Sequence, residues 1–232
     1  MPGRPERIGH RGAPHEFAEN SLEGFLRAVE MGADAVELDV HQTRDGVVVV
    51  HHDPEVTTPD GRKVAIASQT GAQIARCRLP GDLHIPTLVA VLDALGDRAM
   101  VYVELKGEGV ANDAVNIALA YGKRYAFHSF DHQVIRELDA RKLPIRLGVL
   151  IDRDVRDPVK VVNECAWVDD IWVHHSLADQ ETVNAVHAQG QKIICWTVND
   201  PAEAKRLARR GVDGLCTDDL RAVSFEPVAG SR

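Results

Sequence analysis

Histidine-containing turns follow two of the segments that this sequence predicts to be β-strands. The first turn is His10-Arg11-Gly12 and the second is His52-Asp53. Histidine titrates near neutral pH, so one imidazole can remove a proton from a nucleophile while another supplies a proton to a leaving group. We therefore expect His10 and His52 to act as an acid–base pair.

Carboxylates accompany the two histidines. Glu37 and Asp39 are two residues apart in an apolar run, so both side chains point to one face of the predicted strand. Glu104 has a similar position in a later apolar run. Burying three carboxylates is costly unless a cation compensates, and an oxygen-rich site of this kind suits Mg²⁺ or Ca²⁺. The alternative is a set of salt bridges in which Lys106 neutralises one of the acids.

Arg11 and Lys106 place positive charge beside these acids. Basic side chains next to a metal ion are typical of sites that bind the anionic oxygens of a phosphoryl group. A sugar hydrolase needs two catalytic carboxylates but no paired histidines. A hydride-transfer enzyme needs a glycine-rich dinucleotide motif, and none follows a predicted strand. The residues therefore favour metal-assisted hydrolysis of a phosphoester.

Short apolar runs alternate with helical patterns along the whole chain. The predicted strands are residues 7–10, 35–41, 100–106, 124–129, 145–151, 170–173, 192–198 and 214–217, with 47–51 continuing the second unit. Seven helical segments lie between them, and such alternation predicts parallel strands. Eight units in a chain of 232 residues predict an α/β fold of the TIM (β/α)8 barrel type. We expect residues 54–85 to form a small, irregular loop inserted after the second strand. We expect residues 1–232 to form a single domain.

The polar side chains named above fall where such a barrel forms its active site. That site lies at the carboxyl ends of the strands. Other chemistry-bearing residues at predicted strand ends are His128, His174, Trp196 and Asp218.

Composition excludes several classes of partner. The formal net charge of −8 argues against a nucleic-acid partner. No apolar run approaches ~18 residues, so we expect no membrane-spanning helix, and the first residues lack the apolar core of a signal peptide. Four widely spaced cysteines suit free thiols in a reducing compartment. We expect a cytoplasmic protein, and the sequence leaves open whether it forms a homo-oligomer.

The order of the motifs resembles the glycerophosphodiester phosphodiesterase family over about residues 7–219. The resemblance rests on His10-Arg11-Gly12, Glu19-Asn20-Ser21, Glu37-Leu38-Asp39, His52-Asp53, Ile85-Pro86-Thr87-Leu88, Glu104-Leu105-Lys106, Trp196-Thr197-Val198-Asn199, Gly211-Val212-Asp213-Gly214 and Thr217-Asp218. It implies a TIM barrel that hydrolyses a small-molecule glycerophosphodiester to an alcohol and sn-glycerol 3-phosphate, a reaction of glycerol and lipid metabolism.

The resemblance also implies a role for each site residue. Glu37, Asp39 and Glu104 match the ligands of one divalent metal ion, Mg²⁺ or Ca²⁺. His10 and His52 match the general acid and base, and Arg11 and Lys106 match phosphate-binding residues. Trp196 matches an aromatic wall of the substrate pocket, and its alternative is a place in the barrel core.

Two other functions remain open from the sequence. The nearer is a lysophospholipase D-like or sphingomyelinase D-like phosphodiesterase, which would need an apolar rim for acyl chains. The farther is a non-catalytic barrel that binds phosphodiesters, which would predict the loss of a histidine or an acid. The sequence also leaves open which histidine is the acid, and whether water or a neighbouring glycerol hydroxyl is the nucleophile.

Overall fold

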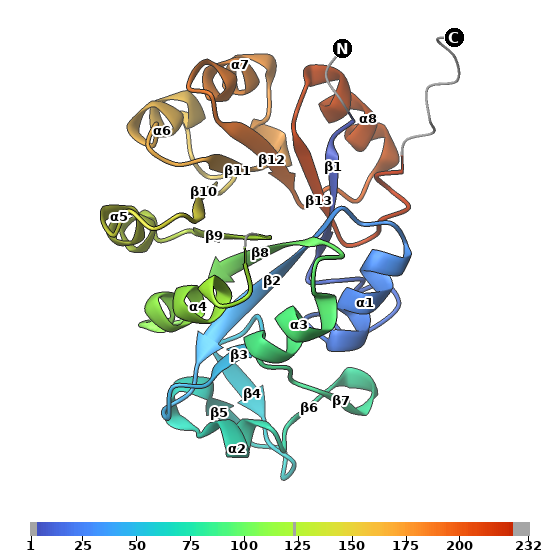
Figure 1. Cartoon of the computed structure of the whole chain (residues 1–232). Coiled ribbons are helices and arrows are strands. Elements are labelled where there is room, and N and C mark those ends of the chain that lie inside the picture. Colours follow the sequence, from blue (N-terminus) through green and yellow to red (C-terminus); the bar gives the residue numbers. More distant parts are fainter. Residues whose placement is uncertain (1–3, 123, 225–232) are drawn as a thin grey trace.

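Eight parallel strands form a closed ring in the computed structural model, which describes residues 4–122 and 124–224 (Figure 1). In chain order the strands are β1 (Glu6–His10), β2 (Ala35–Gln42), β8 (Met100–Leu105), β9 (Tyr125–Ser129), β10 (Arg146–Ile151), β11 (Asp170–His174), β12 (Lys192–Trp196) and β13 (Gly214–Thr217). Strand β1 pairs in parallel with both β2 and β13, which closes the ring. The predicted TIM barrel is confirmed.

Seven helices surround this ring in the described part of the chain. They are α1 (Leu22–Glu30), α3 (Leu88–Leu95), α4 (Val110–Leu119), α5 (His132–Ala140), α6 (Pro158–Glu164), α7 (Gln180–Ala188) and α8 (Pro201–Arg210). Polar side chains cap six of them by accepting hydrogen bonds from the first turn: Ser21, Thr87, Asp131, Asp157, Asp179 and Asp200. Each helix in residues 4–122 and 124–224 is too short or too polar to cross a membrane.

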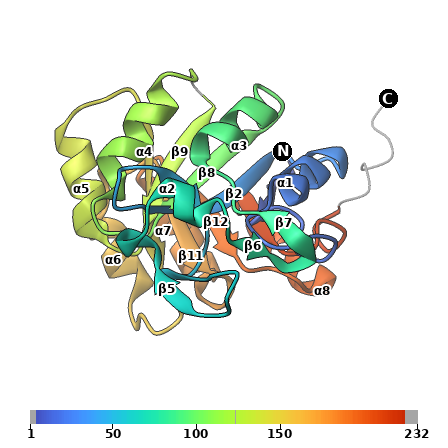
Figure 2. The same ribbon diagram turned by 90° about the horizontal axis from the view of Figure 1, so that it is seen from below.

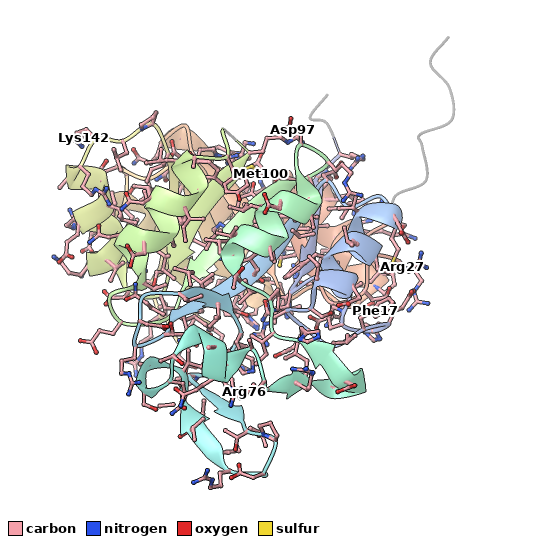
Figure 3. The ribbon with its side chains drawn as sticks, turned by 60° about the horizontal axis from the view of Figure 1, so that its bottom comes forward. Phe17, Arg27, Arg76, Asp97, Met100 and Lys142 are labelled. Atoms are coloured by element: carbon pink, nitrogen blue, oxygen red, sulfur yellow. The ribbon has the colours of Figure 1, made fainter. Side chains whose placement is uncertain are left out.

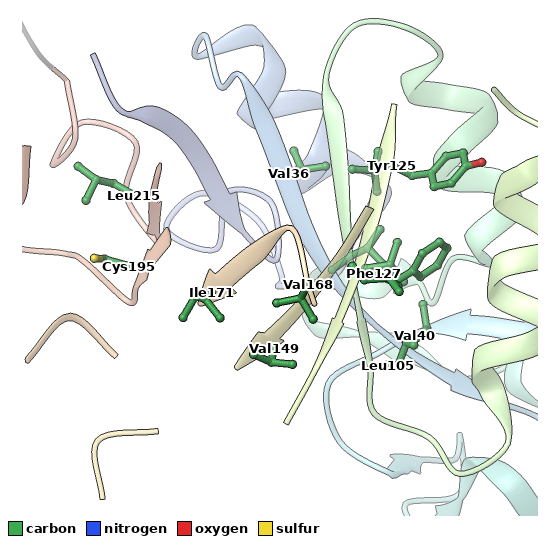
Figure 4. Close-up of a cluster of buried hydrophobic side chains, with 14 of the residues drawn as sticks. Val36, Val40, Leu105, Tyr125, Phe127, Val149, Val168, Ile171, Cys195 and Leu215 are labelled. Carbon is green, nitrogen blue, oxygen red and sulfur yellow. The ribbon is translucent and has the colours of Figure 1, made fainter. Parts of the chain in front are cut away.

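Alternation along the strands divides the barrel into two apolar layers. On β2, Val36, Leu38 and Val40 pack between the strands and the helices, and Figure 4 shows part of this layer around Val36 and Phe127. Inward-facing residues form a separate cluster inside the ring: Ile8, Ala35, Tyr102, Ala126, Leu150, Trp172, Ile194 and Cys216. Glu37 and Asp39 alternate with the outward-facing residues of β2, so the predicted orientation of these two carboxylates is confirmed.

The segment after the second strand is more ordered than the irregular loop predicted over residues 54–85. Strand β3 (Val48–Val50) turns back antiparallel to β2. Two hairpins follow, β4 (Glu55–Thr57) with β5 (Lys63–Ala65) and β6 (Arg78–Leu79) with β7 (Leu83–His84), and α2 (Gly71–Ile74) lies between them in the chain. These elements have an apolar cluster of their own: Val49, Val56, Ile66, Ile74, Cys77, Leu79 and Ile85. Strands of two or three residues are too short to show a periodic pattern, which is why the sequence predicted only a loop.

The insertion lies at one end of the barrel. Figure 2 views the ribbon from below, with the insertion toward the viewer and the helices around the strands. In Figure 3, Arg76 marks the insertion, and Phe17 and Arg27 lie on the neighbouring side that carries α1. This arrangement places the insertion beside the segment from which His52 comes.

Candidate active site

The turn between β1 and α1 carries His10 and Arg11 to the end of the barrel. Arg11 has a left-handed backbone with φ 56°, and Gly12 follows with φ 93°. A Cβ atom at Gly12 would lie 2.8 Å from the backbone carbonyl carbon of Gly24 in α1. Glycine is therefore required at position 12 both for its backbone conformation and for the close approach of the helix.

Each residue of the motif Glu19-Asn20-Ser21 supports this turn through a different contact. Glu19 Oε2 accepts a hydrogen bond of 2.9 Å from Arg11 Nη1. Asn20 Nδ2 donates to Asp39 Oδ2 at 2.8 Å, and Asp39 Oδ2 also lies 3.1 Å from Arg11 Nε. Ser21 caps α1. The motif thus holds the Arg11 guanidinium between two carboxylates and fixes the helix that follows.

Three carboxylates crowd together inside the mouth of the barrel. Glu37, Asp39 and Glu104 are all buried. Lys106 Nζ lies 2.9 Å from Glu104 Oε1 and 3.6 Å from Asp39 Oδ1. Burial and the charges of Glu37 and Glu104 raise the pKa of Asp39 to about 8, although Arg11 and Lys106 oppose this rise. If all three carboxylates were ionised, the cluster would carry more negative charge than its two basic neighbours offset, and the raised pKa of Asp39 reflects this imbalance together with burial.

A histidine that the sequence analysis did not assign to the site completes a candidate metal centre. One potential ligand atom each from Glu37, Glu104 and His128 lie within 4.8 Å of one another. His128 Nε2 is 3.7 Å from Glu37 Oε1, and the His128 ring stacks on Trp172 at 4.3 Å. Within the described residues, Glu37 Oε1 is buried and has no hydrogen-bond partner. A buried oxygen without a partner in an acidic cluster fits a divalent cation.

This set differs from the predicted ligands by one residue. Asp39 is not one of these three potential ligands but lies next to them. It contacts Arg11, Lys106 and Asn20. Its Oδ1 atom is buried and, among the described residues, also lacks a hydrogen-bond partner. Metal ligation by Asp39 stays a prediction. The signal for His128 was its position at the end of a predicted strand, but a single histidine in an apolar run more often belongs to a core.

Each predicted catalytic histidine has a carboxylate partner. The Asp218 Oδ1 atom lies 2.6 Å from His10 Nδ1, and Asn199 Nδ2 donates to Asp218 Oδ2 at 2.7 Å. Asp53 Oδ1 lies 2.8 Å from His52 Nδ1. In both pairs the carboxylate orients the imidazole ring through Nδ1, so this hydrogen bond does not occupy Nε2. Asp218 was not among the predicted site residues.

The two imidazoles nevertheless have different surroundings. Burial by itself lowers the pKa of His10, but the hydrogen bond to Asp218 and the charge of Glu37 outweigh burial and raise that pKa. Burial and the positive charge of Arg11 lower the pKa of His52, and its hydrogen bond to Asp53 offsets only part of this effect. Opposite shifts are suited to one proton donor and one proton acceptor.

A cavity of about 270 Å³ at the carboxyl ends of the strands brings most of these groups together. Its lining includes seven of the eight predicted site residues, namely His10, Arg11, Glu37, His52, Glu104, Lys106 and Trp196. Asp39 is absent from the lining, since it is fully buried beside the cluster. Trp196 is half-buried, and its ring lies 5.4 Å from that of Phe130 and 5.5 Å from that of His174. The lining of the cavity therefore combines aromatic rings with charged side chains.

Comparison with known proteins identifies the family. The sequence profile of the glycerophosphoryl diester phosphodiesterase family matches residues 10–222. The chain belongs to this family. It is similar to a glycerophosphodiester phosphodiesterase of Caldanaerobacter subterraneus subsp. tengcongensis, with 28% identity over 228 residues that cover 91% of this chain and 93% of that protein.

Solved structures of glycerophosphodiester phosphodiesterases have the same fold. The enzyme from Thermotoga maritima has a TM-score of 0.80 and 29% identity, and the match covers 95% of this chain and 97% of that chain. An Oleispira antarctica phosphodiesterase, solved in complex with the product sn-glycerol-3-phosphate, has a TM-score of 0.82 and 24% identity over 95% of each chain. The predicted family, barrel and enzyme class are thus confirmed.

Proposed function

We propose that this chain hydrolyses glycerophosphodiesters to an alcohol and sn-glycerol 3-phosphate with the aid of one divalent metal ion, Mg²⁺ or Ca²⁺. The observation that carries the proposal is the single cavity lined by His10, His52, Arg11 and Lys106 beside buried carboxylates. Family membership supports the same reaction. The proposed product is also the molecule bound in the Oleispira antarctica phosphodiesterase.

The acidic cluster is the proposed place of the metal ion. Glu37, Asp39 and Glu104 would hold the ion, and His128 would join them. A bound divalent ion would polarise a phosphoryl oxygen and offset negative charge in the transition state. The buried oxygens Glu37 Oε1 and Asp39 Oδ1, which lack hydrogen-bond partners in the described residues, support this assignment.

The basic and imidazole side chains would perform the remaining steps. Arg11 and Lys106 bind the non-bridging phosphate oxygens and orient the phosphorus. One histidine removes the proton of the nucleophile as a new oxygen–phosphorus bond forms. The other gives a proton to the alcohol oxygen as its bond to phosphorus breaks. If the neighbouring glycerol hydroxyl attacks, the product is a cyclic phosphodiester, which one water molecule then opens to glycerol 3-phosphate.

The proposal is tested by measuring release of glycerol 3-phosphate from a glycerophosphodiester in the presence of Mg²⁺, Ca²⁺ or EDTA. We expect EDTA to abolish release, and His10→Ala or His52→Ala to lower turnover at least ~10²-fold, because each removes an acid–base group. His84→Ala, which changes an exposed histidine of the insertion, serves as the control. Near-normal turnover in either active-site variant, or activity that resists EDTA, contradicts the mechanism.

The same assay separates the alternative functions. Release of the headgroup from a lysophospholipid in preference to a glycerophosphodiester would favour the lysophospholipase D-like activity, and absence of any hydrolysis would favour a binding protein. A cytoplasmic location, a role in lipid metabolism, the absence of a nucleic-acid partner and a single domain over residues 1–232 stay predictions. Whether the chain forms a homo-oligomer stays open.

A further inference from the structure

The candidate metal ligand His128 lacks the hydrogen bond that usually orients such a histidine. Its Nε2 atom faces the acidic cluster, 3.7 Å from Glu37 Oε1. A histidine that binds a metal ion through one ring nitrogen commonly donates from the other nitrogen to a carboxylate or a backbone carbonyl, which fixes the ring. His128 Nδ1 is buried and has no hydrogen-bond partner within residues 4–122 and 124–224. The ring must therefore be oriented by a contact of another kind.

The indole ring of Trp172 provides such a contact inside the barrel. The imidazole of His128 lies nearly flat on it, with 4.3 Å between the ring centroids and 13° between the ring planes. His128 and Trp172 are each 1% exposed, so neither ring can rotate into solvent. A buried stack lets two rings slide past each other but resists tilting. The indole therefore fixes the plane in which His128 Nε2 lies.

The stack is possible because Gly148 has no side chain. His128 lies on β9 and Trp172 on β11, and β10 runs between these two strands. Gly148 of β10 pairs with His128 on one side and with Asp170 on the other, so it faces the same interior as His128. A Cβ atom at position 148 would lie 3.2 Å from Trp172 Cδ1. The glycine therefore leaves the gap through which the indole reaches across β10 to the imidazole.

A second aromatic ring holds Trp172 in place. Tyr102 meets the indole nearly edge-on, with 5.0 Å between the ring centroids and an angle of 74°. Tyr102 Oη in turn donates a hydrogen bond of 2.8 Å to Glu6 Oε2. Trp172 Nε1 is buried and, among the described residues, lacks a hydrogen-bond partner. A smaller apolar residue would fill this layer without an unpaired donor, so the broad face of the indole is what tryptophan adds.

We propose that Trp172 orients His128 as a nitrogen ligand of the divalent metal ion, and that Gly148 leaves the space that this contact needs. The inference rests on the proposed metal-dependent function, because it concerns the ion of that site. It adds two positioning residues in the barrel interior, outside the motifs that carry the predicted site residues. In this role Trp172 acts only through His128.

The test measures Mn²⁺ binding to the purified chain by isothermal titration calorimetry and by pulsed electron paramagnetic resonance. A coordinated imidazole gives a nitrogen modulation that carboxylates do not give. We expect this modulation in the unaltered chain and its loss in His128→Gln and Trp172→Leu. Trp172→Leu should weaken binding about 10- to 100-fold, the range for residues that orient a metal ligand. Trp172→Phe keeps an aromatic face, so it should retain the modulation and most of the affinity.

A double-mutant cycle separates positioning from general damage to the core. Once His128 is replaced, Trp172→Leu has no ligand left to orient, so in the His128→Gln background it should not weaken Mn²⁺ binding further. Gly148→Ala keeps both rings but crowds the indole, and it should weaken binding less than Trp172→Leu does. The control is Ile8→Ala, which truncates another buried side chain of the same interior cluster. It should lower stability and leave the affinity for Mn²⁺ unchanged.

The outcomes separate this inference from the proposed function. A spectrum of the unaltered chain without nitrogen modulation, additive losses in the cycle, or an equal loss of affinity in Ile8→Ala overturns the positioning role and leaves metal-dependent hydrolysis intact. If Trp172→Leu does not fold, Gly148→Ala takes its place in the cycle. Failure of the unaltered chain to bind Mn²⁺, Mg²⁺ or Ca²⁺ contradicts the proposed function and this inference together.

Discussion

At the scale of single residues, Asp53 controls the charge state of His52. The carboxylate stabilises the protonated imidazole, while burial and Arg11 lower the pKa of His52. Asp53→Asn removes the stabilising charge, so the pKa of His52 falls further below its ordinary value. The limb of the kcat/KM–pH profile that reports His52 should therefore move to lower pH. Asp60→Asn is the control, and a limb that stays in place or moves to higher pH contradicts the role of Asp53.

The metal ligands can be distinguished by binding rather than by turnover. We expect His128→Gln and Asp39→Asn each to weaken Mg²⁺ or Ca²⁺ binding about 10- to 100-fold, the range that tuning residues of metal sites show. Isothermal titration calorimetry of the purified chain measures this directly. His187→Gln, at an exposed histidine that contacts Asp213, provides the control. If only one of the two variants weakens binding, the other residue is not a ligand.

The sequence predicted most of the residues that line the candidate site, because these side chains follow local patterns. The period of two along β2 was enough to place Glu37 and Asp39 on the inner face. Asp218 was missed because its contact with His10 joins residues 208 positions apart, and no local pattern encodes such a pair. His128 was missed because its neighbours Ala126 and Phe127 are core residues. The proximity of His128 to the acidic cluster is set by the strand register, which pairs His128 with Glu104.

At the scale of elements, the β1–α1 turn depends on one glycine. Gly12→Ala should lower the free energy of unfolding by about 1–3 kcal/mol, because a left-handed backbone is strained for alanine and its Cβ would strike α1. Urea denaturation measures the loss. Gly61→Ala is a matched control, since Gly61 has φ 82° with no atom within 4 Å of the added Cβ. The Gly12 variant should be the less stable of the two, and equal losses would show that contact with α1 contributes nothing.

At the scale of the whole molecule, an ion pair at the opposite end of the barrel from the acidic cluster joins two neighbouring strands. Arg146 Nη2 on β10 lies 2.5 Å from Asp170 Oδ1 on β11, and Asp170 is buried. Arg146→Met would leave a buried carboxylate unpaired, and we expect it to cost about 3–5 kcal/mol of unfolding free energy. Urea denaturation at pH 7 measures this loss.

The same pair predicts a dependence of stability on pH. Burial raises the pKa of Asp170 from 3.8 to about 6, although Arg146 opposes the rise. Between pH 3.8 and about 6, Asp170 is protonated in the folded chain and ionised in the unfolded chain. The contribution of Asp170 to stability therefore falls as the pH rises from about 4 to 6. Without Arg146 the pKa rises further, so the destabilisation by Arg146→Met should be smaller at pH 5 than at pH 8. Compared with the single variant Asp170→Asn, the double variant Arg146→Met/Asp170→Asn should be destabilised equally at pH 5 and pH 8, and a persisting difference would exclude Asp170 as the cause.

Closure of the ring by β1 and β13 has a consequence for synthesis on the ribosome. Strand β1 emerges early, yet one of its two hydrogen-bonded neighbours, β13, is made some two hundred residues later. Until Gly214–Thr217 leave the exit tunnel, both β1 and β12 keep an exposed edge that can pair with another nascent chain. The contact of His10 with Asp218 also forms only after this strand has been made. The chain therefore completes its candidate active site and loses its open edges in the same step, when β13 pairs with β1 and β12.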